Sequence, residues 1–362
     1  MHSLPKAQKR ARELFERVPG LSSFVQPLDL AELPTPITEA PQLARKWGVA
    51  SLHIKRDDKT SPIYGGSKVR NLEYFLGKAV AQGATGVATM GPHGSHQALA
   101  TAVFTQRLGL RSRVLLTPQP HVHEVDLNAR LLPAFGMEII RCNSFPSVPL
   151  AYLRARLTPL GGKRPYWIPP GSSDTLGVLA VVEGALEVAR AVRQGELTMP
   201  DDVVVATGTC ATAAGLYLGF AIARLPVRLV AVRVVPMIVT GPKKMQRMAH
   251  KALALLRQLG YHEEPQWGEL LWVNDCASPG YSMANEQALS AIEDVRQDGD
   301  FRTDVAYTGK TLGVFRSRVL PPERRVLFWN TLSGVDPTVP GEQALPPSPS
   351  LQSPHAASGV KS

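Results

Sequence analysis

Short runs rich in β-branched residues alternate with longer helical patterns along this chain, and that alternation limits the fold more than any other feature. It predicts parallel sheets covered on both faces, so we expect an α/β fold with parallel-rich sheets flanked by helices. The runs that predict strands are Ser51–Lys55, Gly86–Thr89, Arg113–Leu116, Glu138–Arg141, Tyr166–Ile168, Val203–Ala206, Arg228–Val234 and Val326–Trp329. The patterns that predict helices are Lys68–Gln82, His96–Leu108, Leu127–Phe135, Gly177–Gln194, Thr212–Ala223, Lys243–Leu259 and Ser282–Gln297. Sheets of this kind bind ligands at the carboxyl ends of their strands.

The length of 362 residues is enough for two domains, each with its own core. No window approaches about 18 consecutive apolar residues, and no apolar stretch follows the basic N-terminus, so we expect neither a membrane span nor a signal peptide. The three cysteines form no disulfide framework and no Cys-x-x-Cys pair, which fits a reducing, cytoplasmic location. Proline and serine dominate from about Pro337, and we expect residues 337–362 to form a disordered tail.

The formal net charge of +10 raises the question of a nucleic-acid partner. The densest basic stretches, Lys6–Arg12 and Lys243–Lys251, have the pattern of amphipathic helices. They lack the interleaved aromatic residues that stack on bases, so solvated helix faces are the favoured interpretation. We therefore expect no nucleic-acid partner.

The first loop that suggests chemistry runs from Tyr64 through two glycines to Lys68. The glycines allow a sharp turn, after which Lys68 lies at or just inside the start of a helix. A cation there opposes the helix dipole, and a positive local field lowers a lysine pKa. The resulting neutral amine is the form that attacks an aldehyde to make an imine. An ordinary exposed helix lysine is the alternative.

A second loop joins a predicted strand to a helix that begins near Ser95. This serine can cap the helix and leave amide N–H groups facing an anion. His93 and His96 could be a metal pair, and so could His121 and His123, but no carboxylate or cysteine stands nearby to complete a metal shell. Helix-capping or surface histidines are favoured, and no metal is expected.

The third loop, Thr207–Thr212, follows an apolar predicted strand and leads into a helix. Small and hydroxyl residues at a helix N-terminus predict a phosphate cradle built from amide N–H groups and threonine hydroxyls. The loop matches neither the dinucleotide fingerprint nor the P-loop pattern. A tight strand-to-helix turn without a ligand is the alternative.

Together with further segments, these loops resemble the family of 1-aminocyclopropane-1-carboxylate deaminases and D-cysteine desulfhydrases, over roughly residues 30–334. Each motif is weak alone, but their shared order is specific. The segments that carry the resemblance are Leu33–Pro36, Lys55–Asp58, Tyr64–Glu73, Gly94–His96, Ile168–Ser173, Gly280–Tyr281, Ala306–Lys310 and Val326–Thr331.

The resemblance implies the two-domain, tryptophan-synthase-β-like fold of pyridoxal 5'-phosphate (PLP) enzymes, called fold type II. A large PLP-binding domain would comprise residues 1–70 and 179–336, and a small domain residues 71–178. The resemblance also implies PLP as the cofactor, a small amino acid as the substrate, and a homodimer.

The same resemblance implies roles for single residues. Lys68 would form the Schiff base with PLP and move the substrate proton, while Tyr281 and Tyr307 would flank the substrate. Thr308 would face the pyridine nitrogen, where a threonine makes the ring a weaker electron sink than a carboxylate partner does. That threonine is typical of the desulfhydrase branch. The residues expected to hold the phosphate are Gly208, Thr209, Cys210, Ala211 and Thr212.

Several positions differ from the family. Ser67 replaces an asparagine before the lysine, and Asn71 replaces a second basic residue near the phosphate. Gly94 stands at the catalytic serine, and Ser95 stands at the asparagine that hydrogen-bonds the 3'-oxygen of PLP. Asn71 and Ser95 are nevertheless expected to contact the cofactor.

We therefore expect a PLP-dependent lyase or deaminase for a small amino acid, with D-cysteine desulfhydration to a 2-keto acid and ammonia as the first choice. Other β-eliminations, a racemisation and ring opening of aminocyclopropane carboxylate are alternatives. A PLP-binding protein with little catalysis is a second class, because the differing positions affect proton transfer and cofactor contact.

Overall fold

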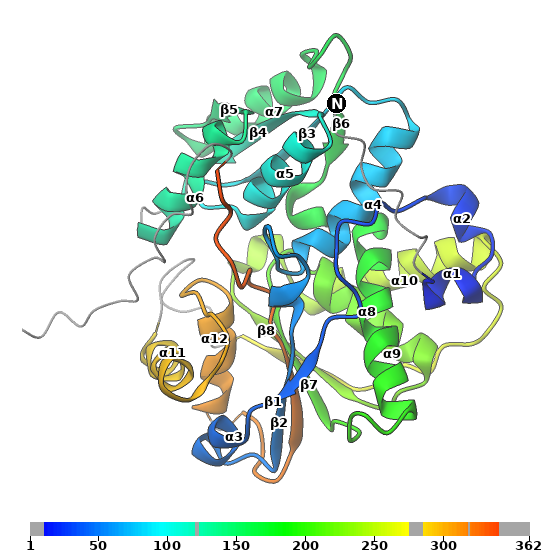
Figure 1. Cartoon of the computed structure of the whole chain (residues 1–362), viewed down its shortest axis with the longest axis vertical. Coiled ribbons are helices and arrows are strands. Elements are labelled where there is room, and N and C mark those ends of the chain that lie inside the picture. The colour runs from blue at the N-terminus through cyan, green and yellow to red at the C-terminus, as the bar shows by residue number, and fades with distance from the viewer. Residues whose placement is uncertain (1–10, 120–122, 275–284, 318, 340–362) are drawn as a thin grey trace, which may run out of the picture.

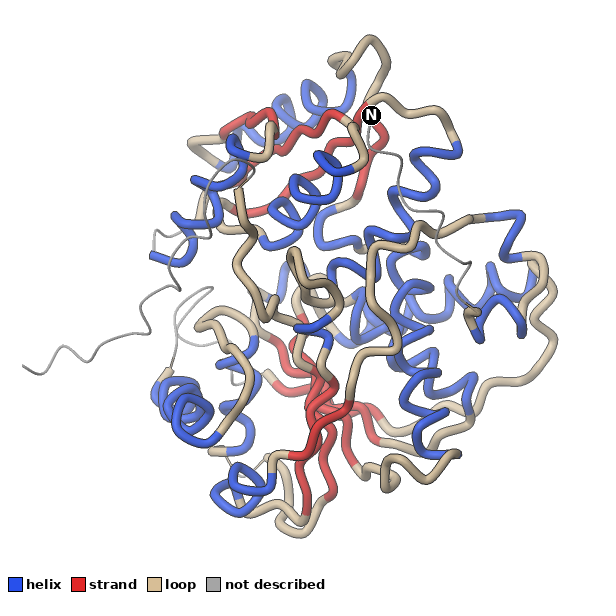
Figure 2. The backbone as a smooth tube through the Cα atoms, in the orientation of Figure 1, coloured by secondary structure: helices blue, strands red, loops and turns tan. Residues whose placement is uncertain are grey.

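The computed structural model describes residues 11–119, 123–274, 285–317 and 319–339, and its strands form two separate sheets (Figure 1, Figure 2). The larger sheet has six strands, which in spatial order are β1 (Ile37–Glu39), β2 (Ser51–Lys55), β10 (Arg325–Trp329), β7 (Asp202–Thr207), β8 (Arg228–Arg233) and β9 (Leu270–Val273). The smaller sheet has four strands, which are β5 (Met137–Arg141), β4 (Arg111–Thr117), β3 (Gly86–Pro92) and β6 (Tyr166–Ile168).

All described strand pairs are parallel except β1 with β2. Parallel strands need long crossover connections, and helices supply them here, as the alternating sequence pattern requires. The predicted α/β fold with parallel-rich sheets flanked by helices is confirmed.

The larger sheet is apolar on both faces because successive side chains of its central strands point to opposite sides. In β7, Val203 and Val205 join the larger of two core clusters around this sheet, whereas Val204 between them joins the other. In Figure 1, one group of helices lies to the right of this sheet and a second group lies to its left. The first group is α8 (Thr175–Arg193), α9 (Ala211–Ala223) and α10 (Pro242–Gln258), and the second is α3 (Pro41–Trp47), α11 (Glu286–Asp298) and α12 (Thr308–Leu312).

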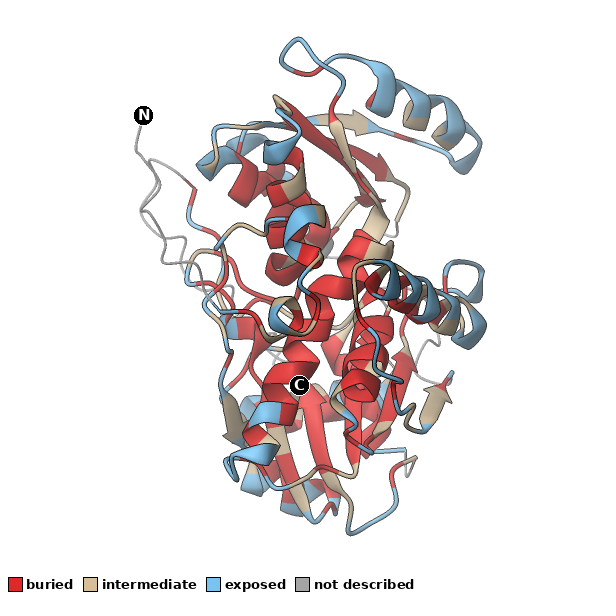
Figure 3. Ribbon diagram, turned by 90° about the vertical axis from the view of Figure 1, so that its right-hand side faces the viewer, coloured by how far each residue is buried: buried red, intermediate tan, exposed pale blue. Residues whose placement is uncertain are grey.

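The smaller sheet carries three helices, which are α5 (His96–Arg107), α6 (His123–Ala134) and α7 (Val148–Leu157). Helices α5 and α6 pack on the face that joins the main core, and α7 packs on the other face around Leu115 and Ala155. Figure 3 shows buried residues running through both sheets and the helices between them. Two short helices, α1 (Glu13–Arg17) and α2 (Leu21–Phe24), precede β1.

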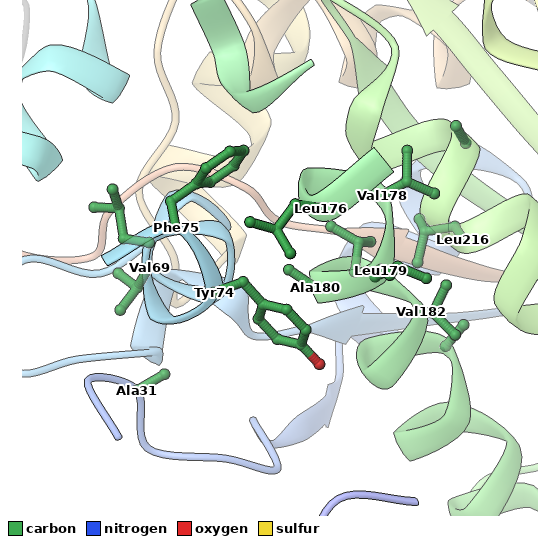
Figure 4. Packing of buried hydrophobic residues seen from close by; sticks show 14 of the residues in the cluster. Ala31, Val69, Tyr74, Phe75, Leu176, Val178, Leu179, Ala180, Val182 and Leu216 are labelled. Atoms are coloured by element: carbon green, nitrogen blue, oxygen red, sulfur yellow. The ribbon is translucent and has the colours of Figure 1, made fainter. Parts of the chain in front are cut away.

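Helix α4 (Lys68–Ala81) begins at the predicted lysine and is almost wholly buried. Tyr74 and Phe75 of α4 lie toward Leu176 and Leu179 of α8 in the close view of the core (Figure 4). Because α4 is packed along most of its length, its first residue has a fixed position relative to the large sheet.

Buried charges also anchor α4. The Arg70 guanidinium donates to Asp57 Oδ1 at 2.8 Å and to Glu187 Oε1 at 2.8 Å, and Lys55 Nζ donates to Glu187 Oε2 at 2.7 Å. Trp329 at the end of β10 donates to Asp57 Oδ2 at 2.8 Å. These bonds satisfy buried charges that would otherwise be costly, and they tie α4 to β2, α8 and β10.

The sequence predicted eight strands and seven helices that recur with ends shifted by a few residues. It missed the short edge strands β1 and β9 and the short helices α2, α3, α7 and α12, and the helix expected around Lys6–Arg12 lies largely outside the described residues. The start of the predicted helix Ser282–Gln297 lies outside the described residues, and the described helix begins at Glu286.

The predicted domain boundaries stay predictions. The four strands of the smaller sheet fall within residues 71–178, and the six strands of the larger sheet fall outside that range. Only residues 337–339 of the predicted tail are described, and the rest of it lies outside the described residues. Within the described ranges, none of the helices combines the length and the apolar character that crossing a membrane requires.

Candidate active site

A cavity of about 130 Å³ lies where the carboxyl ends of strands from both sheets meet. Loops after β2, β10 and β7 supply one side, and loops after β3 and β6 supply the other. This is the place at which open α/β sheets bind ligands, and it unites the three loops that the sequence marked.

Lys68 lines this cavity as the first residue of α4. Burial lowers the pKa of its amine to about 8. The predicted direction of the shift is therefore confirmed, although burial and not the helix dipole is the main cause. A large neutral fraction near pH 7.5 makes this amine a good nucleophile toward an aldehyde.

The two glycines before Lys68 are required by the local backbone. Gly66 has a φ of 90°, and a Cβ there would lie 2.8 Å from Thr331 O. The amide of Ser67 donates to the same Thr331 oxygen at 3.2 Å. The lysine loop therefore lies directly against the loop after β10. A side chain at residue 66 would push the two loops apart.

The predicted phosphate cradle also lines the cavity, from Thr207 at the end of β7 to Thr212 in the first turn of α9. Amide N–H groups at the start of α9 have no intrahelical partners, and the helix dipole favours an anion there. Gly208 keeps the loop close to Tyr307, because a Cβ at residue 208 would lie 3.2 Å from the Tyr307 ring.

Cys210 takes an unusual conformation at the start of α9. Its φ is 83°, in the left-handed region that favours glycine, and its side chain is buried. The thiol lies 3.1 Å from Thr240 Oγ1 and within 3.8 Å of Gly241 O. A non-glycine residue held at positive φ costs about 1–2 kcal/mol, which this packing must offset.

The second predicted loop meets the cavity at the start of α5. Ser95 caps the helix as predicted, since its hydroxyl accepts a hydrogen bond from the Ala98 amide at 3.2 Å. The ring of His96 also lines the cavity, and its Nδ1 lies 2.9 Å from the hydroxyl of Tyr64. Among the described residues there is no cluster of three or more His, Cys, Asp or Glu side chains that could hold a metal, and His121 lies outside them.

Tyr307 lines the cavity from the segment before α12, as does Asp304. Thr308 is fully buried beside them but is not a lining residue. Its hydroxyl donates to Asp304 Oδ1 at 2.6 Å and accepts from the Asp304 amide at 2.8 Å. The proposed contact of Thr308 with the pyridine nitrogen stays a prediction.

Two further predicted residues do not line the described cavity. Asn71 donates to Gly177 O at 2.8 Å and is buried, and its Oδ1 has no hydrogen-bond partner among the described atoms. Tyr281 lies outside the described residues. Their predicted roles stay predictions, whereas the remaining predicted residues lie together at the cavity. Those are Lys68, Ser95, Gly208, Thr209, Cys210, Ala211, Thr212 and Tyr307.

The sequence did not assign several other lining residues to the site. Tyr64, Asp304 and the segment Thr331–Ser333 are the clearest. Tyr64 is adjacent to the predicted glycine pair, and Thr331 follows the predicted final strand, so their position at strand ends was a usable signal. No sequence signal marked Asp304, because only the folded loop brings this residue to the cavity.

Comparisons with known proteins decide the family. The model of the family described as "Pyridoxal-phosphate dependent enzyme" matches residues 28–331. The chain belongs to this family. Its cofactor is accordingly PLP, and the predicted family resemblance and enzyme class are confirmed.

Individual relatives narrow the class. A D-cysteine desulfhydrase of Serratia proteamaculans is 33% identical over 79% of this chain and 86% of its own length. One from Klebsiella pneumoniae is 31% identical over 84% of this chain and 93% of its own. A solved structure, an ACC deaminase homologue, has 27% identity, covers 90% of this chain and 96% of its own, and gives a TM-score of 0.73. This member of the PLP family is thus an enzyme of the lyase and deaminase type.

The residues present fit the cofactor. The amine of Lys68 can bind an aldehyde, and the helix N-terminus at Cys210 and Ala211 can bind a phosphate. A cavity of about 150 Å³ holds a benzene ring in other proteins, so a cavity of this size suits a single aromatic ring. These three features meet in one site.

Proposed function

We propose that this enzyme removes the β-substituent of a small D-amino acid, with D-cysteine as the leading substrate. The observation that carries the proposal is the cavity in which the Lys68 amine and the α9 phosphate cradle meet. The desulfhydrase relatives support D-cysteine in particular. The net reaction would convert D-cysteine and water to hydrogen sulfide, pyruvate and ammonia.

Each residue of the pocket would have a separate task. The Lys68 amine would hold the aldehyde carbon of PLP, and the amides and hydroxyls of residues 208–212 would hold its phosphate. Bound PLP supplies an electron sink that acidifies the α-carbon of an amino acid. The buried amine of Lys68, whose pKa is about 8, would accept the α-proton of a bound amino acid. Tyr307 would flank the substrate against Gly208.

Ring opening of aminocyclopropane carboxylate is a second candidate, and the ACC deaminase homologue supports it. Thr308, a residue typical of the desulfhydrase branch in the family resemblance, favours the desulfhydrase activity, although it does not itself line the cavity. The two substrates are therefore compared directly in the assay below.

The test begins with the visible spectrum of the purified protein mixed with PLP. We expect an absorption band that disappears in Lys68→Ala and persists in Lys59→Ala, a control at an exposed lysine nearby. Borohydride should fix PLP on Lys68. A colourless wild-type protein, or the same band in both variants, would contradict the assignment of Lys68.

The second step measures sulfide and pyruvate from D-cysteine and L-cysteine, and 2-oxobutanoate and ammonia from aminocyclopropane carboxylate. Sulfide from D-cysteine at the highest kcat/KM would support the proposal. A spectrum that shifts with amino acids without any product would favour the PLP-binding protein with little catalysis.

The homodimer and the cytoplasmic location also stay predictions, based on the family resemblance and on the cysteine content. Light scattering of the purified protein would test the first, since a mass near 39.2 kDa would indicate a monomer.

A further inference from the structure

One ring of the pocket, His96, is held by hydrogen bonds from two elements. Tyr64, in the loop that leads to Lys68, places its hydroxyl 2.9 Å from His96 Nδ1. Asn128 of α6 places its Nδ2 3.4 Å from the same nitrogen. One contact comes from the loop between β2 of the larger sheet and α4, and the other comes from α6, which packs on the smaller sheet.

Asn128 acts as a donor to Nδ1, and the hydroxyl of Tyr64 can donate to the same nitrogen. Asn128 Nδ2 also lies 3.0 Å from Gly94 O, which can only accept, so the amide nitrogen and not the amide oxygen faces this side. Burial raises the pKa of Tyr64, so its hydroxyl keeps the proton and can donate. A nitrogen that accepts two hydrogen bonds carries no proton, and the ring proton must then be on Nε2.

The surroundings keep this ring neutral. Burial lowers the pKa of His96, and the charge of Lys68 acts in the same direction against the opposing charge of Asp304. The charged groups that act on the imidazole, besides the Tyr64 and Asn128 dipoles, are Lys68, Arg302, Asp304 and Asp336. Within the described part of the chain, both hydrogen bonds of the ring end at Nδ1, and the ring lines the cavity.

We propose that His96 is a neutral hydrogen-bond donor of the pocket, fixed in its Nε2–H form by Tyr64 and Asn128, which binds an anionic oxygen of a bound molecule. Given the proposed function on which this inference rests, two such oxygens are available. One is the phenolic oxygen of PLP, and the other is the carboxylate of the amino acid. A fixed, uncharged N–H donor selects ligands by the position of their oxygen atom, because its hydrogen is held in one direction before the ligand binds.

Protonation of the ring would undo this arrangement. A hydrogen on Nδ1 would point at the Asn128 N–H group, and the two donors would repel each other. The contribution of His96 should therefore be complete above its pKa and disappear as the pH falls below it. Because that pKa is lowered, the loss is expected below about pH 6.5, the ordinary value for histidine.

The first experiment needs no cofactor and thus separates this proposal from the proposed function. We would record histidine side-chain ¹⁵N spectra of the full-length protein at pH 7.5 and assign His96 with His96→Gln. The expected result is a protonated Nε2 and an unprotonated Nδ1. A ring protonated on Nδ1, or on both nitrogens, would overturn the proposal.

Tyr64→Phe provides the next measurement, because it removes one donor with little change in shape. We expect the His96 pKa to rise and its Nδ1 signal to shift toward a mixture of the two tautomers. Tyr152→Phe is the matched control, since that hydroxyl accepts from Arg156 far from His96 and its loss should change neither value. A His96 signal unaffected by Tyr64→Phe would contradict the role of Tyr64.

The second experiment identifies the oxygen. His96→Phe keeps a planar ring without the donor, and His96→Gln retains an N–H donor. A tenfold or larger weakening of PLP binding in His96→Phe, restored in part by His96→Gln, would assign the cofactor oxygen. A tenfold or larger weakening of D-alanine binding, measured from the visible band of the PLP-loaded protein, would instead identify the substrate carboxylate as the oxygen that His96 binds. Unchanged affinity for both would refute the donor role, whereas a wild-type protein that binds no PLP would contradict the proposed function and not the tautomer result.

Discussion

At the scale of the residue, the site depends on groups whose state differs from the one they have in water. Lys68 has a pKa lowered by burial, Tyr64 has one raised by burial, and Cys210 has a backbone conformation that favours glycine. Each is a cost to folding that brings a reactive or binding group to the cavity. The three occur within loops at strand ends, where the fold can fix them.

The titration of Lys68 is the first prediction. In cofactor-free protein, labelling of Lys68 by an aldehyde and borohydride should rise with pH around a midpoint near 8. A lysine with the ordinary pKa of 10.5 would have about 200-fold less neutral amine at pH 7.5. Mass spectrometry of peptides labelled between pH 6 and 10 measures the midpoint. Labelling of exposed Lys59 in the same samples shows that the reagent is active, and a Lys68 midpoint near the ordinary value of 10.5 would contradict the shift.

Gly171 tests the phosphate cradle. It has a φ of 60°, and a Cβ there would lie 2.2 Å from Thr209 Oγ1, so Gly171→Ala must displace a residue of the cradle. We expect PLP affinity to fall about tenfold, which corresponds to about 1.4 kcal/mol. Gly195→Ala is the matched control, because Gly195 has a φ of 75° and no atom within 4 Å of the added carbon. It should lose about 1 kcal/mol of stability from its backbone alone and bind PLP normally. Equal PLP titrations of the two variants would show that the cradle does not need Gly171.

At the scale of the element, α8 and α9 are packed too closely for side chains at their crossing. A Cβ at Gly215 would lie 2.6 Å from Val181 Cβ and 2.7 Å from Val178 O. The backbone oxygen cannot move without shifting α8 itself. This contact holds α9, and with it the residues at its start that line the cavity, in a fixed position against α8.

Gly215→Ala should therefore destabilise the protein, although alanine favours helices by about 1 kcal/mol. Overpacking typically costs about 1–3 kcal/mol, and the close backbone oxygen favours the upper end of that range, so we expect a net loss of about 1–2 kcal/mol. Gly241→Ala is the control, because Gly241 has an extended backbone and no neighbour within 4 Å of the new carbon. Its change should stay within about 0.5 kcal/mol. Urea unfolding measures both, and a Gly215→Ala variant as stable as the wild type would contradict the close packing.

Elements were predictable from sequence to the extent that periodicity marks them. The buried strand β7 and the helix α9 have strong apolar patterns, and the sequence placed both correctly. Strand β1 has three residues and α12 has five, too few for a pattern to emerge. The loops Tyr64–Lys68 and Thr207–Thr212 were found because small residues stand between a strand and a helix. The pairing of Tyr64 with His96 could not be predicted from the sequence, because the two residues are 32 positions apart and their contact depends on how the two halves of the fold meet.

At the scale of the whole molecule, buried charges connect the N-terminal segment, α4 and α8. Glu183 and Glu187 are one turn apart in α8 and face opposite electrostatic conditions. Burial opposes ionisation of both. For Glu187 the charges of Arg70 and Lys55 outweigh burial and hold the pKa at about 2. For Glu183 burial dominates over the more distant Arg12 and raises the pKa to about 7.

Glu187 should stabilise the protein above its unfolded pKa of 4.5, and that contribution should disappear as the pH falls toward 2. Glu187→Gln removes the partner of two buried cations, so we expect a loss of about 3–5 kcal/mol at pH 7. The variant should also lose less stability than the wild type between pH 5 and pH 3. Urea unfolding across this range measures both effects, and parallel curves would contradict the lowered pKa.

Glu183 should show the reverse dependence. A carboxyl group with a raised pKa in the folded state favours folding at low pH, and this advantage is lost as the pH rises through about 7. Glu183→Gln stays neutral at every pH and retains an oxygen that can accept from the Leu14 amide, which donates to Glu183 Oε1 at 3.2 Å. Its stability relative to the wild type should therefore increase by on the order of 2 kcal/mol between pH 5 and pH 8. Glu187→Gln, the same substitution one turn away in the same helix, is the comparison, because its stability relative to the wild type should stay nearly constant between pH 5 and pH 8. A Glu183→Gln variant that is equally destabilised at both pH values would mean that Glu183 is ionised throughout, held by Arg12 more strongly than burial opposes it.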